Sequence, residues 1–216
     1  MVVGGGIAGI QAAKSAAASG VRVMLVEQTA HWGGRAVVDG VVIDNIAAEE
    51  WIKGALSELS VMDNVVIRNR TQGSGVYDHG YALGYERISD HTPGDSRPRH
   101  RLWRIRCKQI IVATGAIERP LSFAGNDIPG VMLAAAVRDY VVNYGVSPGD
   151  RTVIVTNNDD AYRTAIVLKD AGLDIPLIID ARPKGGGILM DQAIAAGIRV
   201  ETGRGIATVS YTHLTL

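Results

Sequence analysis

Apolar residues along most of the chain alternate between two spacings. Short uninterrupted apolar runs, typical of buried strands, are separated by stretches in which apolar residues recur every three or four positions, as on one face of a helix. Strands that alternate with helices predict an α/β fold with a parallel sheet. In the first part of the chain, the expected strands are 2–3, 21–27, 65–70 and 109–113, and the expected helices are 7–19 and 47–59, the second with Asp44 or Asn45 as N-cap.

Residues 73–107 follow a different pattern. Apolar and polar residues alternate here with a period of two, and the turns between the runs are polar. This pattern predicts an antiparallel β insert with strands at 73–77, 81–88 and 101–107.

The last of these strands has two different faces. Trp103, Ile105 and Cys107 alternate with mostly charged residues, so we expect one buried and one solvated face. Six basic residues lie between Arg97 and Lys108, but no aromatic residue is interleaved among them on the charged face. They therefore favour a solvated strand face over a nucleic-acid site.

A second alternation of strands and helices follows and stops early. Its order of elements is that of the start of another nucleotide-binding unit. The expected helices are 132–144, 161–171 and 188–196, and the expected strands are 152–156, 176–180 and 198–201.

Composition narrows the class of protein. The 216 residues carry 22 basic and 22 acidic side chains, so the net charge of zero gives no reason to expect a nucleic acid or an anionic membrane as partner. One cysteine, Cys107, cannot form an intrachain disulfide or a thiolate metal cluster. The N-terminus lacks the basic start of a signal peptide, and no apolar run reaches the ~18 residues that span a bilayer. We expect a cytoplasmic protein.

Glycine is over-represented, with 26 residues in 216, and its first cluster suggests a binding site. Gly4, Gly6 and Gly9 follow a predicted strand and open a predicted helix in the spacing Gly-x-Gly-x-x-Gly. In this pattern the first glycine permits the tight turn, the second lets a pyrophosphate approach the backbone, and the third lets the helix pack on the sheet. The phosphates face unpaired N–H groups at the helix N-terminus. Alone, the pattern fits a tight turn without a ligand equally well.

Two further residues favour a dinucleotide. Ala13 is small where the helix must lie against the sheet, and Glu27 ends the second predicted strand, where an acidic side chain accepts hydrogen bonds from an adenosine ribose. Neither Gln28 nor Thr29 supplies a cation for a 2′-phosphate. The sequence therefore favours FAD or NAD over NADP.

The fold class predicted from these patterns is a Rossmann-like FAD/NAD(P)-binding α/β fold with a three-stranded antiparallel insert and a truncated second Rossmann-like unit. The first dinucleotide-binding domain is expected at 1–120, with a clipped N-terminal strand, and the incomplete second unit at 121–209. Residues 210–216 are expected to be a non-native tail from sequencing-adapter read-through.

Several longer motifs resemble those of the alpha subunits of heterotetrameric sarcosine oxidases, which are flavoproteins with two dinucleotide-binding domains. The most specific are Ala-Thr-Gly-Ala-Ile-Glu-Arg-Pro at 113–120 and Thr-Asn-Asn-Asp at 156–159. The resemblance covers residues 2 to about 207, and its other motifs lie at 33–34, 77–79, 85–87, 101–104, 110–115, 126–132 and 161–163.

The resemblance implies one subunit of a complex that oxidises sarcosine to glycine with O2 and tetrahydrofolate. In such complexes the amine-oxidising FAD belongs to the beta subunit, an FMN lies at the interface of the alpha and beta subunits, and the alpha subunit holds a noncovalent NAD. The implied partners are the beta, gamma and delta subunits. The single cysteine excludes the disulfide-reductase branch of the fold.

By this resemblance, the first site is expected to hold the adenosine diphosphate half of NAD, with FAD as the alternative. No residue set for covalent or metal catalysis is found, and the fragment by itself is expected to be inactive. The expected cofactor-binding residues are Gly4, Gly6, Gly9 and Glu27, with Gly34 and Arg35 nearby and Thr114 and Gly115 closing the site.

The second unit departs from the glycine pattern. Thr156, Asn158 and Ala161 stand where glycines are expected, while Asp180 still ends the next strand in the ribose position. Asp159 and Asp160 lie at the turn that would face phosphate. Two like charges about 4 Å apart repel by roughly 4 kcal/mol at an effective dielectric of 20, enough to remove most nucleotide affinity unless a cation intervenes. We expect a fold kept without an ordinary dinucleotide site, contributing to the FMN interface.

The remaining candidates are weaker. Five scattered histidines show no metal-ligand spacing, and only His79, beside Asp78, merits a test. Arg119 fits either a cofactor or partner contact or a buried salt bridge. Two other functions stay open: a self-contained FAD-dependent, NADH-using reductase, and a non-catalytic nucleotide-binding scaffold.

Overall fold

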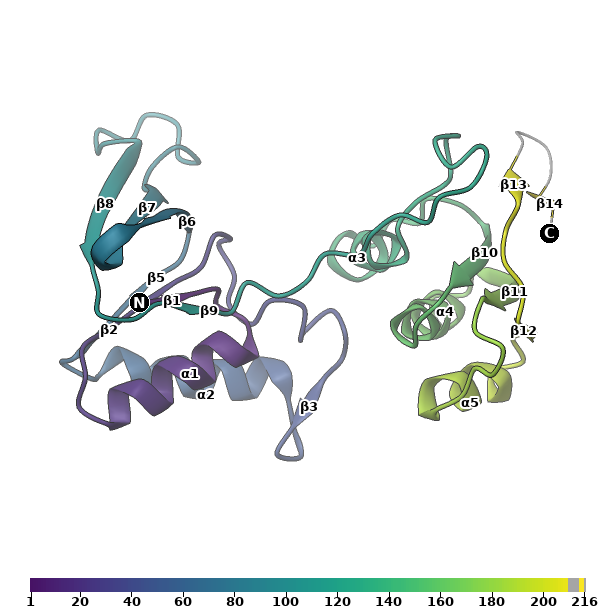
Figure 1. The fold of residues 1–216 in the computed structure, drawn as a ribbon, viewed down its shortest axis with the longest axis horizontal. Helices are drawn as coiled ribbons and strands as arrows, with labels where there is room; N and C mark the ends of the chain where they lie inside the picture. Colours follow the sequence, from purple (N-terminus) through teal and green to yellow (C-terminus); the bar gives the residue numbers. More distant parts are fainter. Residues whose placement is uncertain (210–213, 216) are drawn as a thin grey trace. The chain divides into compact units, whose positions relative to one another are not determined.

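The computed structural model describes residues 1–209 and 214–215, and contacts divide the chain into two compact units, Met1–Ala116 and Ile117–Leu216 (Figure 1). Both units contain a parallel sheet flanked by helices, and the first also contains a three-stranded antiparallel sheet. The predicted α/β class with an antiparallel insert is confirmed. No helix in the described part of the chain is long and apolar enough to cross a membrane.

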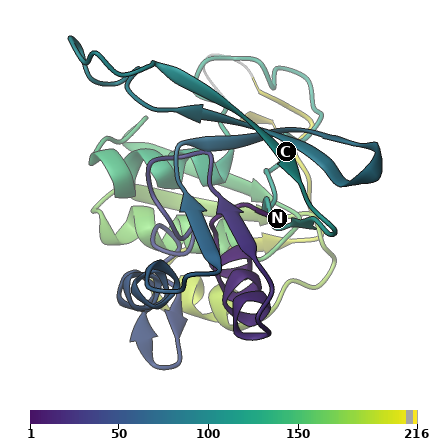
Figure 2. The same cartoon turned by 90° about the vertical axis from the view of Figure 1, so that its left-hand side faces the viewer.

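The first unit is built on a four-stranded parallel sheet in the order β5-β2-β1-β9. Helices α1 and α2 lie on one side of this sheet and the β insert on the other (Figures 1 and 2). The elements are β1 (Val2–Val3), β2 (Val23–Val26), β5 (Val65–Arg68), β9 (Ile111–Val112), α1 (Ile7–Ala18) and α2 (Ala48–Ser60).

Small residues let α1 lie close to the sheet. Its buried face is made of Gly9, Ile10, Ala13 and Ala17, so little side chain separates the helix from the strands. Ala13 is fully buried, as its predicted packing role requires. Helix α2 buries Ile52, Ala55 and Leu59 in the same core, at the three- to four-residue spacing expected for one helix face.

The β insert consists of β6 (Thr71–Tyr77), β7 (Tyr81–Arg87) and β8 (His100–Arg106), paired antiparallel in that order. In β8, Trp103 and Ile105 are half-buried, whereas the neighbouring arginines are exposed. The predicted alternation of a buried and a solvated face is therefore confirmed.

The predicted N-cap of α2 is wrong. Asp44 and Asn45 have φ values of 51° and 65° and form the two-residue turn of a short hairpin, β3 (Val42–Ile43) with β4 (Ile46–Ala47). Left-handed backbone at both central positions matches the twist of a hairpin, and Asp and Asn tolerate it better than most residues. The residue at the N-cap position is Ala47, which has no side-chain hydrogen bond to offer.

The second unit has a three-stranded parallel sheet in the order β10-β11-β12. Its core joins Ile154 and Ile178 of the sheet to Tyr162 and Leu168 of a helix. The elements are α3 (Ala134–Tyr144), β10 (Arg151–Thr156), α4 (Asp160–Asp170), β11 (Asp174–Asp180), α5 (Ile188–Ala195), β12 (Val200–Thr202) and β13 (Thr208–Val209).

The expected non-native tail lies largely outside the described residues. Positions 210–213 and 216 are not described, and β14 (Leu214–Thr215) pairs antiparallel with β13.

Candidate functional site

The glycine turn, residues 4–9, comprises the connection from β1 to α1 and the first three residues of α1. Its first and last glycines are sterically required. Gly4 has a φ of +107°, and a Cβ there would run into the backbone carbonyl of Ala113. A Cβ on Gly9 would run into the carbonyl oxygen of Gly4. Only residues without a side chain allow this close approach of helix, turn and neighbouring strand.

Gly6 differs, because nothing lies within 4 Å of the position that its Cβ would take. It is the N-cap of α1, and no side chain caps the helix. The first turn also contains no acidic residue. The N–H groups of this helix N-terminus are therefore not capped by a side chain of the described residues, and uncapped N–H groups at this position receive a phosphate in dinucleotide-binding folds.

Glu27 follows β2 directly, and the residue is 7% exposed. Its Oε2 accepts a 2.7 Å hydrogen bond from the backbone N–H of Gly5. Its Oε1 accepts hydrogen bonds from the N–H and the hydroxyl of Thr29 at 2.8 and 2.9 Å. A carboxylate offers about four lone-pair positions, so three donors hold it in place and one position is left for a ligand hydroxyl.

Gly5 and Trp32 are two further residues of this site, and the glycine pattern predicts neither. A Cβ on Gly5 would lie 2.8 Å from the Glu27 Cβ and even closer to the Trp32 ring. Gly5 therefore lets the indole and the Glu27 side chain pack against the turn from two directions. The sequence signal for this role was the unbroken run of three glycines at positions 4–6, because the glycine pattern itself places no requirement on position 5.

Gly33 and Gly34, which follow β2, lie beside the glycine turn. The Gly33 N–H donates to the carbonyl of Gly5 at 2.7 Å, and a Cβ on Gly34 would be 3.3 Å from the Gly6 Cα. Arg35 is half-buried and its guanidinium forms a 3.3 Å ion pair with Asp39.

The residues after β9 border the same turn from another side. The Cα of Thr114 lies 3.1 Å from the position of a Gly4 Cβ, so Thr114 is brought to the turn. Gly115 has a φ of +74° and is exposed, with open space around it. The structure thus brings Glu27, Gly34 and Thr114 to the glycine turn, whereas nothing lies within 4 Å of the Cβ position of Gly115. The charge of Arg35 is engaged with Asp39.

The second unit places cations against both acids of its turn, which is the condition under which the expected charge repulsion is offset. Asp159 Oδ1 accepts a 2.7 Å hydrogen bond from Arg182 Nη2. Asp160 Oδ2 accepts one of 2.9 Å from the fully buried Arg138, which also donates to the Asp160 carbonyl. Local sequence does not reveal these arginines, because one lies 22 residues before Asp160 and the other 23 residues after Asp159.

Asp180 ends β11 as predicted, but its carboxylate is fully buried and bound by the protein itself. Arg182 donates to both oxygens, through Nε at 3.0 Å and Nη2 at 2.6 Å, and Tyr162 donates its hydroxyl at 2.7 Å. Burial opposes ionisation, but these hydrogen bonds outweigh it and keep the pKa of Asp180 below its ordinary 3.8. Arg182 thus joins the end of β11 to the turn before α4, across the position where a ribose would bind.

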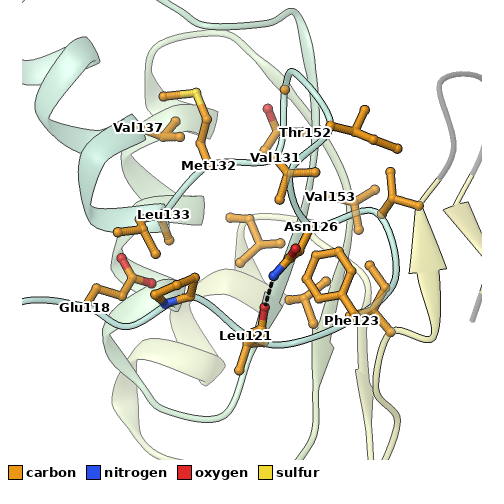
Figure 3. A pocket seen from close by; sticks show the side chains of 18 of the residues that line it. Glu118, Leu121, Phe123, Asn126, Val131, Met132, Leu133, Val137, Thr152 and Val153 are labelled. Atoms are coloured by element: carbon orange, nitrogen blue, oxygen red, sulfur yellow. Dashed lines mark hydrogen bonds between the residues drawn. The ribbon is translucent and has the colours of Figure 1, made fainter.

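The second unit also contains an apolar cavity of about 460 Å³. Figure 3 shows Phe123, Met132 and Val153 around it, and the Asn126 amide donating to the Leu121 carbonyl at 3.1 Å. A more polar cavity of about 360 Å³ is lined by Arg119 with Asn157 and Asn158.

The weaker candidates do not form a catalytic set. Arg119 is exposed, so the predicted alternative of a buried salt bridge is wrong. Asp78 and His79 are both exposed, and among the described residues no hydrogen bond joins their side chains. The described residues contain no group of three or more histidine, cysteine or acidic side chains that could hold a metal, and His213 lies outside them.

The chain is similar to known oxidoreductases along nearly its whole length. The pyridine nucleotide-disulphide oxidoreductase family pattern matches residues 1–213. The sarcosine oxidase alpha subunit of Rhizobium meliloti is 38% identical over 99% of this chain and 22% of its own length, and that of Corynebacterium sp. strain P-1 is 40% identical over 94% and 21%. The chain thus spans about a fifth of the length of the curated relatives it matches.

Solved structures agree on the fold. The L-proline dehydrogenase of P. horikoshii is 26% identical, with a TM-score of 0.63 over 86% of this chain and 36% of its own. The thioredoxin reductase of Lactococcus lactis is 21% identical and has a TM-score of 0.66 over 97% of this chain and 65% of its own.

Replacing Gly5 with alanine is expected to destabilise the first unit by about 1–3 kcal/mol, because the new methyl group overlaps the Trp32 ring and the Glu27 side chain. Gly54→Ala is the matched control. Gly54 lies in exposed α2 backbone with nothing within 4 Å of its Cβ position, so this change should stabilise by about 0.5–1 kcal/mol. Urea unfolding monitored by circular dichroism measures both, and a Gly5→Ala variant as stable as wild type would contradict the packing described.

Tyr162 predicts a loss of stability at alkaline pH. Burial, and then the hydrogen bond to Asp180, raise the pKa of Tyr162 to about 12 from 10.0, so the folded state prefers the protonated phenol. The difference in free energy of unfolding between wild type and Tyr162→Phe should be constant below pH 10 and fall between about pH 10 and 12. Tyr144→Phe, at an exposed ring, is the control. A difference that does not change with pH would show that Tyr162 is not held protonated.

Proposed function

Because the chain belongs to the pyridine nucleotide-disulphide oxidoreductase family, we propose that its first unit binds the adenosine diphosphate half of NAD within the alpha subunit of a sarcosine oxidase. The observation that carries the proposal is the buried Glu27 carboxylate, held against the backbone of the glycine turn. The proposed cofactor-binding residues are Gly4, Gly6, Gly9, Glu27, Gly34, Arg35, Thr114 and Gly115.

Each part of the proposed site has a separate task. The open N-terminus of α1 at Gly6 receives the pyrophosphate through backbone N–H groups. Glu27 accepts a hydrogen bond from a ribose hydroxyl through its remaining lone-pair position. When bound, NAD supplies a nicotinamide that can exchange a hydride. The residues of this chain bind and orient the cofactor, and we assign none of them a catalytic step.

FAD is the alternative occupant, because it contains the same adenosine diphosphate half. Gly6 and Glu27 contact only this half in the proposed arrangement, so they accept either molecule. The NAD assignment rests on the resemblance to sarcosine oxidase alpha subunits, and it is supported by the 38–40% identity to three such subunits.

We propose that the second unit keeps the nucleotide-binding fold without binding a dinucleotide, and that it contributes to an FMN site shared with the beta subunit. The closed arrangement of Arg182 between Asp159 and Asp180 supports the first part. The curated relatives are named as alpha subunits of sarcosine oxidase, which supports a multi-subunit complex and a sarcosine substrate. The proposed beta, gamma and delta partners rest on the resemblance to heterotetrameric sarcosine oxidases. The closed second unit speaks against a self-contained NADH-using reductase, which needs a second open nucleotide site.

Glu27→Gln tests the proposed site. Removing the charge weakens the hydrogen bond to the ribose, so the Kd for NAD should rise about tenfold or more in calorimetric titration. Glu49→Gln, on the exposed start of α2, removes the same charge and should leave the Kd unchanged. Protein that carries no NAD or FAD on purification and binds neither in titration would overturn the proposal.

The proposed reaction is tested in the assembled complex. The full-length protein combined with its neighbouring subunits should form peroxide in a sarcosine-dependent manner. A rate with NADH but none with sarcosine would instead favour the reductase, and nucleotide binding without either rate would favour a scaffold.

A further inference from the structure

Residues 28–30, directly after Glu27, form a turn whose carbonyls accept hydrogen bonds from the two residues before β6 and from the end of β7. The carbonyls of Thr29 and Ala30 accept hydrogen bonds from the backbone N–H of Arg70 at 2.7 Å and from the Asn69 amide at 2.8 Å. The Gln28 carbonyl accepts one of 2.9 Å from Nη2 of Arg87. Arg87 is 59 positions away in the sequence, so only the folded chain places its guanidinium at this turn.

Among the described residues, Arg87 forms no ion pair within 4.0 Å, although its charge helps to lower the pKa of the nearby Asp90. The other nearby arginine, Arg70, donates to Asp90 at 2.8 Å. That hydrogen bond is the main cause that lowers the pKa of Asp90, so the acid is ionised at neutral pH and balances Arg70. Among the described residues, no carboxylate lies within ion-pair distance of Arg87.

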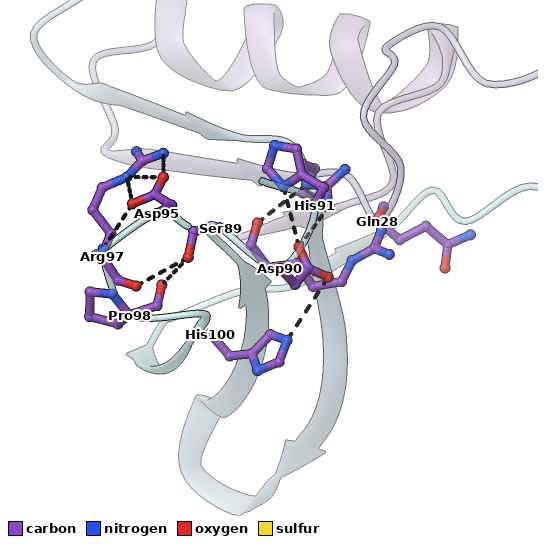
Figure 4. A network of polar contacts seen from close by, with 10 residues as sticks. Gln28, Ser89, Asp90, His91, Asp95, Arg97, Pro98 and His100 are labelled. Atoms are coloured by element: carbon purple, nitrogen blue, oxygen red, sulfur yellow. Dashed lines mark hydrogen bonds and ion pairs between the residues drawn. The ribbon is translucent and has the colours of Figure 1, made fainter. Parts of the chain in front are cut away.

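Two histidines share Asp90 with Arg70. His91 and His100 lie 3.3 and 3.9 Å from its oxygens, as the dashed lines in Figure 4 show. These contacts occupy Asp90 further. Arg87 itself is half-buried, and Nη2 of its guanidinium donates to the Gln28 carbonyl.

We infer that Arg87 is a specificity-determining residue of the adenosine site, which supplies the cation on the 2′ side of the ribose and makes this site a latent acceptor of a 2′-phosphate. The inference rests on the proposed function. In dinucleotide-binding folds an arginine near the residue that ends the second strand accommodates the 2′-phosphate of NADP, whereas an acid there selects NAD. Glu27 and Arg87 place both kinds of side chain at one turn: the acid follows β2, and the cation ends β7.

The two groups act in opposite directions on a phosphorylated ribose. Glu27 repels a 2′-phosphate and accepts a hydrogen bond from a 2′-hydroxyl. Arg87 attracts the phosphate and also holds the turn through Gln28, so it contributes to the binding of both nucleotides but more to NADP. The absence of a cation at positions 28 and 29 therefore does not decide between NAD and NADP.

The test compares the Kd values of NAD and NADP, which differ only in the 2′-phosphate, for wild-type protein and Arg87→Gln. Losing one charge-assisted contact should weaken NADP about tenfold or more and NAD less than threefold. Arg87→Lys keeps the charge and should restore most of the ratio. Glu27→Gln should raise the affinity for NADP relative to NAD, and adding Arg87→Gln to it should remove that gain.

Arg104→Gln, on the exposed face of β8, makes the same change in net charge and is the control. Equal weakening of NAD and NADP by Arg87→Gln would mean that Arg87 only holds the turn, and no change in either would mean that it does not act on the site. Both results overturn the inference while the proposed function stands. If wild-type protein binds neither nucleotide, the proposed function and the role of Arg87 fail together.

Discussion

The hydrogen bond from the Gly5 backbone N–H to the Glu27 carboxylate is the interaction on which the first unit's site depends. It is short, buried and charge-assisted, and it joins the turn before α1 to the end of β2. It forms only because position 5 has no side chain, so that Trp32 and Glu27 can both pack against the turn. The placement of the helix N-terminus relative to the ribose acid follows from this one contact.

The second unit shows what happens when an acid in the same fold position receives an internal cation. Glu27 is held by backbone and hydroxyl donors that leave part of its acceptor capacity available. Asp180 is held by the forked guanidinium of Arg182 and by Tyr162, and no part of it is exposed. Both acids lie at the end of a strand of a parallel sheet. The protein donors around Asp180 leave no acceptor position for a ligand, whereas those around Glu27 leave one.

The β insert does more than cover one face of the first sheet. The first residue of β6, the two residues before it and the end of β7 hold four successive carbonyls, those of residues 27–30, through Thr71, Arg70, Asn69 and Arg87. A turn held on this many sides keeps its shape when a ligand arrives, so less ordering has to accompany binding. The insert therefore links a segment of antiparallel strands, which carries no nucleotide motif, to the geometry of the nucleotide site.

The sequence by itself determined the α/β class, the positions of most strands and helices, the glycine turn and the acid after β2. These features depend on periodicity and on short-range steric needs, which neighbouring residues express directly. The hairpin that displaced the expected N-cap of α2, the pairing of Gly5 with Trp32, and the arginines at Asp159, Asp160 and Gln28 were decided only by the tertiary structure. Each depends on which faces meet when distant segments pack, and a guanidinium acts at a site through space, whatever its distance along the chain.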